Sequence, residues 1–222
     1  MSTQLCRGFT DEQWRGLKVR LIHNGDVQSD EAAWECAITV FERRITERFF
    51  SCIEALENAD TKGDIDPPTA APPDCSMLPK EGSGIVVPGF AIVGLCCLLI
   101  ETLASFGETE KIPVSPPERI AKYLQRDSFR GAFGGEAAGS FVAGVRNGIF
   151  HDAETRKWVI WRKEPSYSIV GIEGGQYFLN RTAFSKALRQ EFERYLTDLR
   201  VPTRVDLRKR FIEKMDDIVE KV

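Results

Sequence analysis

The segment VRNGIFHDAET, residues 145–155, combines three side chains that suit the chemistry of phosphate esters. Arg146 and His151 are separated by four residues, Asn147 follows the arginine, and the chain has one other histidine, His23. An imidazole can take up or release a proton near neutral pH. A guanidinium offers a fixed fork of donors to phosphate oxygens and to the charge of a transition state. This set favours phosphodiester cleavage of RNA, which supplies its own 2′-hydroxyl nucleophile and needs no metal.

Helical geometry separates Arg146 from His151. Five residues place the two side chains about 140° apart around an α-helix and about 7.5 Å apart along it. Because helical side chains lean toward the N-terminus, Arg146 tends to point away from His151 of the same chain. A two-fold axis would bring the arginine of one copy and the histidine of another to one cleft. We therefore expect a homodimer, with Gly148 allowing close approach of the second motif helix.

The sequence RNGIFH resembles the signature of the HEPN family, in which an arginine, a polar residue, a few further residues and a histidine follow one another. The resemblance implies an all-α bundle and a dimeric, metal-independent endoribonuclease without a cofactor. Such an enzyme cleaves single-stranded RNA and leaves a 2′,3′-cyclic phosphate and a 5′-hydroxyl. It also implies that Arg146 binds phosphate and stabilises the transition state, that His151 is the acid or base, and that Asn147 is a polar helper.

The same resemblance favours a toxin or defence effector, with an antitoxin or regulatory protein as a possible partner. Many toxin members carry a tyrosine two residues after the histidine, whereas this chain has Ala153. Two other functions therefore stay open: a non-catalytic HEPN module that binds RNA or nucleotide, and a dimeric scaffold protein.

Structural roles are the alternative for each candidate residue. His151 could close a helix through its terminal carbonyls. Glu101 could be a partner of Arg146, although exposure to solvent is the simpler expectation where its apolar segment ends. Arg146 could instead form a salt bridge with a nearby acid, namely Asp152, Glu154 or Glu136.

Composition indicates one soluble domain over residues 1–222. The net charge is −3, with 42% apolar and 28% charged residues, so bulk charge does not favour binding to nucleic acid and an RNA site must be local. No pair of the six cysteines has the spacing of a zinc or redox motif, and we expect no metal site. Because the N-terminus lacks the apolar core of a signal peptide, we expect a cytoplasmic protein.

The most apolar segment has sixteen residues without a charge, from Ile85 to Ile100. This is shorter than the ~20 residues that a membrane span needs, so we expect a buried core helix and no contact with a membrane.

Apolar spacing of three and four residues predicts a mainly α-helical bundle. Helices are expected at seven places: from Thr10 to about Leu21, from Ser29 or Asp30 to Leu56, from about Pro88 to about Phe106, after Ser115, from about Glu136, after a cap at Asn180 or Thr182, and from Thr203. Residues 58–84 are rich in proline and predict a loop or insertion, in which Asp64 and Asp66 are expected to be solvated. Short β-branched and aromatic runs predict a β-hairpin or three-strand meander over residues 157–179, after the motif helix.

Overall fold

The structure is a computed structural model that describes residues 3–59, 88–107, 115–129, 131–163 and 167–220. Over these residues the chain is mainly helical, as the apolar spacing predicts. The predicted proline-rich segment 58–84 lies outside the described residues apart from its first two positions, which belong to a helix. Asp64 and Asp66 also lie outside them.

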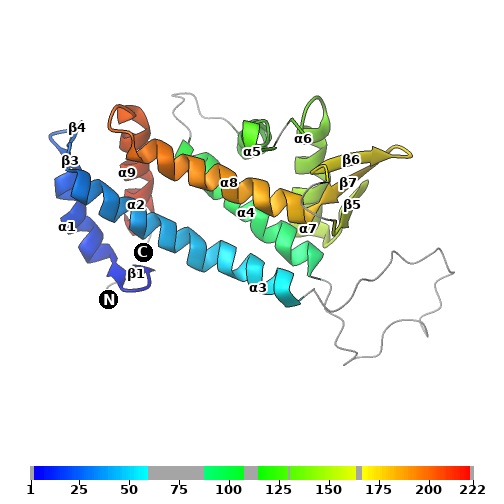
Figure 1. The fold of residues 1–222 in the computed structure, drawn as a ribbon, viewed down its shortest axis with the longest axis horizontal. Helices are drawn as coiled ribbons and strands as arrows, with labels where there is room; N and C mark the ends of the chain where they lie inside the picture. The colour runs from blue at the N-terminus through cyan, green and yellow to red at the C-terminus, as the bar shows by residue number, and fades with distance from the viewer. Residues whose placement is uncertain (1–2, 60–87, 108–114, 130, 164–166, 221–222) are drawn as a thin grey trace.

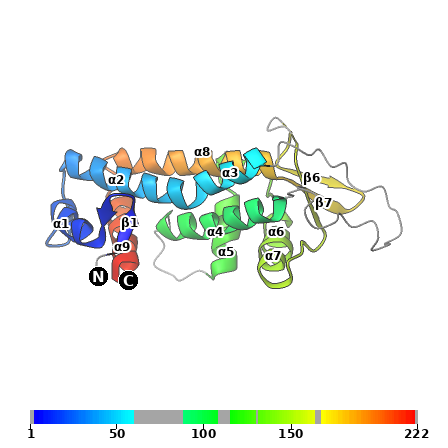
Figure 2. The same ribbon diagram turned by 90° about the horizontal axis from the view of Figure 1, so that it is seen from below.

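Three long helical segments run side by side along the long axis of the molecule (Figures 1 and 2). The first consists of α2 (Glu31–Ile45), a π-helical turn η1 (Thr46–Phe50) and α3 (Ser51–Ala59). The other two are α4 (Gly89–Gly107) and α8 (Arg181–Arg200). Shorter elements pack around them: α1 (Asp11–Leu21) and α9 (Val205–Glu220) lie at one end, α5 (Pro116–Leu124) lies near the middle, and α6 (Ala137–Phe141) lies toward the other end. A short 3-10 turn, η4 (Asp127–Phe129), follows α5 along the chain.

The predicted helix starts are confirmed at side chains that cap them. Gln13 N donates to Thr10 Oγ1, and Gln13 Oε1 accepts from Thr10 N, which is a capping box at α1. Ser115 forms the same arrangement with Glu118 at α5. Asn180 caps α8 by accepting a hydrogen bond from the backbone of Ala183.

Aromatic side chains form the centre of the bundle. Phe41 of α2 lies 4.5 Å from the ring of Phe106 in α4, 5.8 Å from Phe192 in α8 and 5.4 Å from Phe211 in α9. All four rings are buried. By length and composition α4 could cross a membrane, but 61% of its most apolar part is buried inside the structure, as expected of a core helix.

The small β element predicted over 157–179 is confirmed as a three-stranded sheet. Its strands are β5 (Trp158–Trp161), β6 (Val170–Glu173) and β7 (Gln176–Asn180), in the spatial order β5-β7-β6. Strand β7 is antiparallel to β6 and parallel to β5. The indole Nε1 of Trp158 donates to Ser140 Oγ at 3.1 Å, which attaches the sheet to α6.

Two small hairpins near the N-terminus were not predicted. Strand β1 (Gln4–Cys6) pairs with β2 (Phe9–Thr10), and β3 (Ile22–His23) pairs with β4 (Asp26–Val27). Asn24 and Gly25 connect β3 to β4 with φ of 51° and 84°, the conformation that an Asn-Gly hairpin turn adopts. His23 is exposed at the end of β3 and far along the chain from the other candidate residues.

Candidate active site

The motif lies where a π-helical turn meets a short α-helix. The turn is η5 (Val142–Arg146), and it is followed at once by α7 (Asn147–Asp152). A helix over this region is confirmed, whereas the π-helical turn was not predicted. Val145 is fully buried, and the neighbouring Arg146 is partly exposed. Single π-helical turns are frequent at functional sites because they change the direction of the following side chains.

The guanidinium of Arg146 is held from three sides. Its Nε and Nη2 both lie 2.6 Å from Oε1 of Glu101, and its Nη1 donates to Asn147 Oδ1 at 3.0 Å. The ring of Phe150, one helical turn later, lies beneath the cation at 5.4 Å from its carbon centre. Arg146 is therefore oriented before any ligand binds.

Glu101 belongs to α4, and it links this helix to the motif. Its side chain is 29% exposed and that of Arg146 26%, so the pair lies at the edge of the core. The simpler expectation, that Glu101 faces solvent without a partner, is wrong, and the alternative that it pairs with Arg146 is confirmed. The buried Cys97 lies one turn earlier in α4; burial is the main cause that raises the pKa of its thiol, with Glu101 adding to it and Arg146 opposing it.

None of the acids near Arg146 in sequence is its partner. Among the described contacts, Asp152 instead pairs with Arg156, four residues later. The chain reverses after α7, and the carboxylate that reaches Arg146 comes from the helix packed against it.

His151 is exposed in the last turn of α7. No hydrogen bond or ion pair joins it to Arg146, to Asn147 or to any other residue that the structure describes. At the end of α7, the carbonyl oxygen of Gly148 accepts a hydrogen bond from the backbone N–H of Ala153 and not from the imidazole of His151. No contact therefore supports the alternative that His151 caps this helix. The structure therefore brings Arg146, Asn147 and Glu101 together and leaves His151 apart.

Two glycines of the motif contact the segment that returns after α7. Glu154 N donates to Gly148 O at 3.2 Å, and Arg156 N donates to Gly144 O at 3.2 Å. A Cβ on Gly148 would lie 2.2 Å from Glu154 O, which is too close for any other residue. The expectation that Gly148 makes room for a second motif helix is therefore wrong, since the same chain fills that space.

Exposed apolar side chains lie on α4, which carries Glu101, and on α7, which begins directly after Arg146. Leu98 of α4 is 42% exposed and Phe150 of α7 is 40% exposed. Leu98 is three residues before Glu101 and Phe150 four residues after Arg146, so each shares a helix face with a member of the ion pair. Phe90, at the start of α4, is exposed to 41%. The Arg146–Glu101 pair is thus bordered by apolar surface.

No group of three or more histidine, cysteine, aspartate or glutamate side chains could hold a metal ion within the described part of the chain. Comparison of the chain with protein-family models, with curated proteins and with solved structures found no match in any of the three. The geometry of the site is therefore the basis for assigning a function.

Proposed function

We propose that this protein is a metal-independent endoribonuclease of the HEPN type that cleaves single-stranded RNA as a homodimer. The observation that carries the proposal is the contrast between the two motif residues. Arg146 is oriented by three neighbours at the edge of the core, whereas His151 is exposed and without a partner among the described residues. An oriented cation beside a free imidazole suits phosphate binding with proton transfer.

The proposed reaction uses only these side chains and the RNA. One His151 removes the proton from the 2′-hydroxyl, whose oxygen forms a bond to phosphorus as the bond to the 5′-oxygen breaks. The His151 of the second protomer, in its protonated form, gives a proton to that leaving oxygen. Arg146 binds the non-bridging oxygens through N–H donors that Glu101 and Asn147 do not engage. The products are a 2′,3′-cyclic phosphate and a 5′-hydroxyl.

The need for two protomers follows from the arrangement of the motif. Arg146 ends η5 and His151 lies in the last turn of α7; ideal helical geometry places residues five apart about 140° from each other, and no described contact brings the two together. A symmetric dimer would supply the missing histidine to each arginine. The exposed side chains of Leu98 and Phe150 border the ion pair and would be covered in such a dimer.

A second candidate is a module that binds RNA or nucleotide without cleaving it. The observation that favours it is the carboxylate of Glu101, which occupies two donors of Arg146 and repels a phosphate approaching the same group. A toxin or defence role, a cytoplasmic location and an antitoxin or regulatory partner belong to the proposal in either case and rest on the resemblance of the motif alone.

The decisive experiment is cleavage of mixed single-stranded RNA oligonucleotides by the full chain in the presence of a chelator. We expect cleavage by the wild type, and a loss of at least about a hundredfold for Arg146→Ala and for His151→Ala. Asn147→Ala should lose less, because an amide does not transfer protons at neutral pH. DNA should survive, since it has no 2′-hydroxyl.

Two control variants test whether the loss is specific. His23→Ala removes the other exposed histidine, and Arg20→Ala removes a surface arginine that also pairs with one carboxylate, that of Asp30. Both should cleave RNA like the wild type. Binding of RNA without cleavage by the wild type would favour the second candidate, and cleavage by His151→Ala at the parent rate would disprove the mechanism.

A further inference from the structure

The outward face of α4 is apolar, unlike that of the other long helices. Its exposed residues are Phe90, Ala91 and Leu98, and none of them has a polar side chain. A single exposed leucine is ordinary on a folded protein, whereas a continuous apolar face marks a contact surface. The helix lies along one side of the bundle (Figure 2), so this face is open to a partner.

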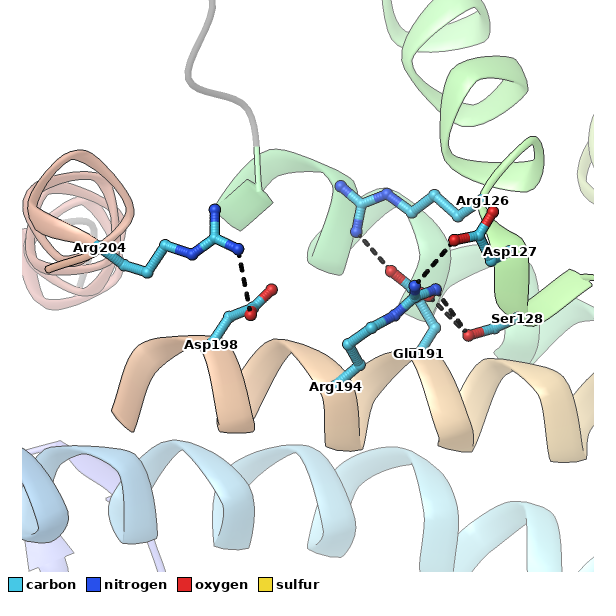
Figure 3. A network of polar contacts seen from close by, with 7 residues as sticks. All are labelled: Arg126, Asp127, Ser128, Glu191, Arg194, Asp198 and Arg204. Atoms are coloured by element: carbon cyan, nitrogen blue, oxygen red, sulfur yellow. Dashed lines mark hydrogen bonds and ion pairs between the residues drawn. The ribbon is translucent and has the colours of Figure 1, made fainter. Parts of the chain in front are cut away.

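The exposed side chains of α8 are all polar, and those near its C-terminal end are paired within the chain. Figure 3 shows Arg194, which lies 2.5 Å from Glu191 and 3.4 Å from Asp127. Arg204, in the connection to α9, lies 3.6 Å from Asp198. The charges of this surface satisfy one another or face water, so they give no reason for a partner to cover it.

The polar groups beside the apolar face of α4 are also satisfied within the chain. Thr102 Oγ1 donates to Leu98 O at 2.9 Å, and Ser105 Oγ donates to Thr102 O at 2.7 Å. Glu101, the only charged residue of α4, lies 2.6 Å from Arg146. Covering the face would therefore leave neither these hydroxyls nor this carboxylate without a partner.

Helical geometry gathers this face into one stripe. The α4 stripe consists of Ala91, Leu95, Leu98, Thr102 and Ser105. These residues follow one another at steps of four, three, four and three, and they lie within about 80° of one another around an ideal α-helix. Leu98 is at the centre of the stripe. Two helices that pack along their length use the same average spacing of about 3.5 residues.

The α4 stripe suits a second copy of the same chain. A contact about a two-fold axis places a surface against itself, so a net charge on that surface would be repelled by its own copy. The α4 stripe has no charged side chain, and the carboxylate of Glu101 beside it is neutralised by Arg146. Phe150, which is 40% exposed and contacts Arg146, extends the apolar surface beyond α4.

We propose that two copies of this protein pair through the α4 stripe in antiparallel orientation, with a two-fold axis perpendicular to the helices next to Leu98. Glu101, with its partner Arg146, lies on one flank of the stripe, about 60° around α4 from Leu98. This axis keeps the two flanks on the same side of the helix pair, with the two Glu101 residues about 9 Å apart along the helix direction. An axis parallel to the helices would place them on opposite sides.

The antiparallel pair therefore brings both copies of the motif to one cleft, as RNA cleavage by a homodimer requires. This consequence for catalysis rests on the proposed function. The pairing of α4 rests only on the charge, the exposure and the spacing of the α4 stripe.

Disulfide crosslinking of the full chain tests the surface and the orientation together. Cys36, Cys52 and Cys75 are first changed to serine, which leaves only buried cysteines. In this background Leu98→Cys places a thiol at the centre of the α4 stripe. Ala91→Cys and Ser105→Cys each place one near an end of it.

The matched control is Ala32→Cys, because Ala32 is an exposed alanine of another long helix, α2. Diamide oxidises the thiols at micromolar protein concentration, and the products are separated by mass. One protein of each mixture carries an added tag, so that the mixed dimer has a mass of its own.

We expect Leu98→Cys to form a crosslinked dimer about tenfold faster than Ala32→Cys or more, since pairing raises the effective concentration of the two thiols. A mixture of Ala91→Cys and Ser105→Cys should form the mixed dimer, because these two positions face each other only when the helices are antiparallel. Ala91→Cys alone should crosslink no faster than the control. Faster crosslinking of Ala91→Cys alone than of the mixture would overturn the proposal, and so would equal rates for Leu98→Cys and Ala32→Cys.

Cleavage of single-stranded RNA separates this proposal from the proposed function. Crosslinking at the α4 stripe with a wild type that does not cleave RNA would support the pairing and count against the nuclease. Cleavage by a wild-type dimer whose stripe cysteines crosslink no faster than the control would overturn the pairing and leave the nuclease.

Discussion

Glu101 Oε1 lies 2.6 Å from both Nε and Nη2 of Arg146, and this pair joins α4 to the last residue of η5, directly before α7. The contact orients the arginine and also neutralises part of its charge. Glu101 therefore both positions Arg146 and lowers its affinity for phosphate. Substitution of Glu101 can separate these two effects.

Glu101→Gln should strengthen the binding of single-stranded RNA several-fold, because it removes a negative charge beside the phosphate site while keeping an oxygen for Arg146. The free energy of unfolding should fall by only about 0.5 to 1 kcal/mol, since the pair is partly exposed. RNA affinity can be measured by fluorescence anisotropy with the His151→Ala background to prevent cleavage. Unchanged affinity would show that Glu101 does not act on the phosphate site.

Gly148→Ala should lower the free energy of unfolding by about 2 kcal/mol, because the new Cβ would lie 2.2 Å from Glu154 O in the returning segment. Urea denaturation checks this value. Gly139→Ala is the matched control: it lies in α6 with nothing within 4 Å of a Cβ, so it should gain up to about 1 kcal/mol. Equal effects in the two variants would contradict the contact between Gly148 and Glu154.

Ala153→Gly should increase the free energy of unfolding by about 0.5 to 1 kcal/mol. Ala153 ends α7 with φ 53° and ψ 32°, a left-handed conformation that glycine adopts at lower cost. Ala143→Gly, at an exposed position inside η5, should instead lose about 1 kcal/mol. A loss of stability in Ala153→Gly, measured in urea, would show that α7 does not end in this conformation.

Leu98→Asp should convert the proposed dimer to a monomer and abolish RNA cleavage, because it places a charge on the apolar surface next to the ion pair. Light scattering coupled to size-exclusion chromatography measures the mass of both forms. Val19→Asp is the control, since Val19 is 67% exposed on α1 at the other end of the molecule. A wild-type monomer at micromolar concentration would argue against the dimer from the outset.

Asp30 makes the stability of α2 depend on pH. Hydrogen bonds from the backbone of Ala33, then from Arg20, lower the pKa of Asp30 below its ordinary value. A carboxylate with a lowered pKa stabilises the folded state above its unfolded pKa, and this stabilisation is lost as the pH falls through the folded value. Asp30→Asn should therefore be less stable than the wild type at pH 7.

The same difference should shrink as the pH falls below about 4, the ordinary pKa of an aspartate, and vanish below the lowered value. Urea midpoints of both proteins across this range measure it. A difference that persists unchanged in acid would mean that the negative charge of Asp30 contributes nothing to capping α2.

The features that the sequence predicted correctly depend on neighbours a few residues apart. The capping boxes of Thr10 with Gln13 and of Ser115 with Glu118 connect residues three apart, so their side chains meet once a helix begins. The apolar stripe of α2 and the uncharged run of α4 likewise predicted which helices form the core. The Asn-Gly pair at Asn24 is a local signal of the same kind, and it specifies the turn between β3 and β4.

Tertiary structure alone decided how the candidate site is built. Glu101 meets Arg146 across 45 positions of sequence, because α4 packs against α7, and no local pattern specifies that neighbour. The space beside Gly148 is filled by Glu154 because the chain reverses after α7, whereas its sequence alone equally suits contact with a second helix. The residue types therefore determined which chemistry was available in this protein. The packing of distant helices determined which side chains could take part in it. Contacts between segments that are distant in sequence form only when the core buries the apolar faces of those segments.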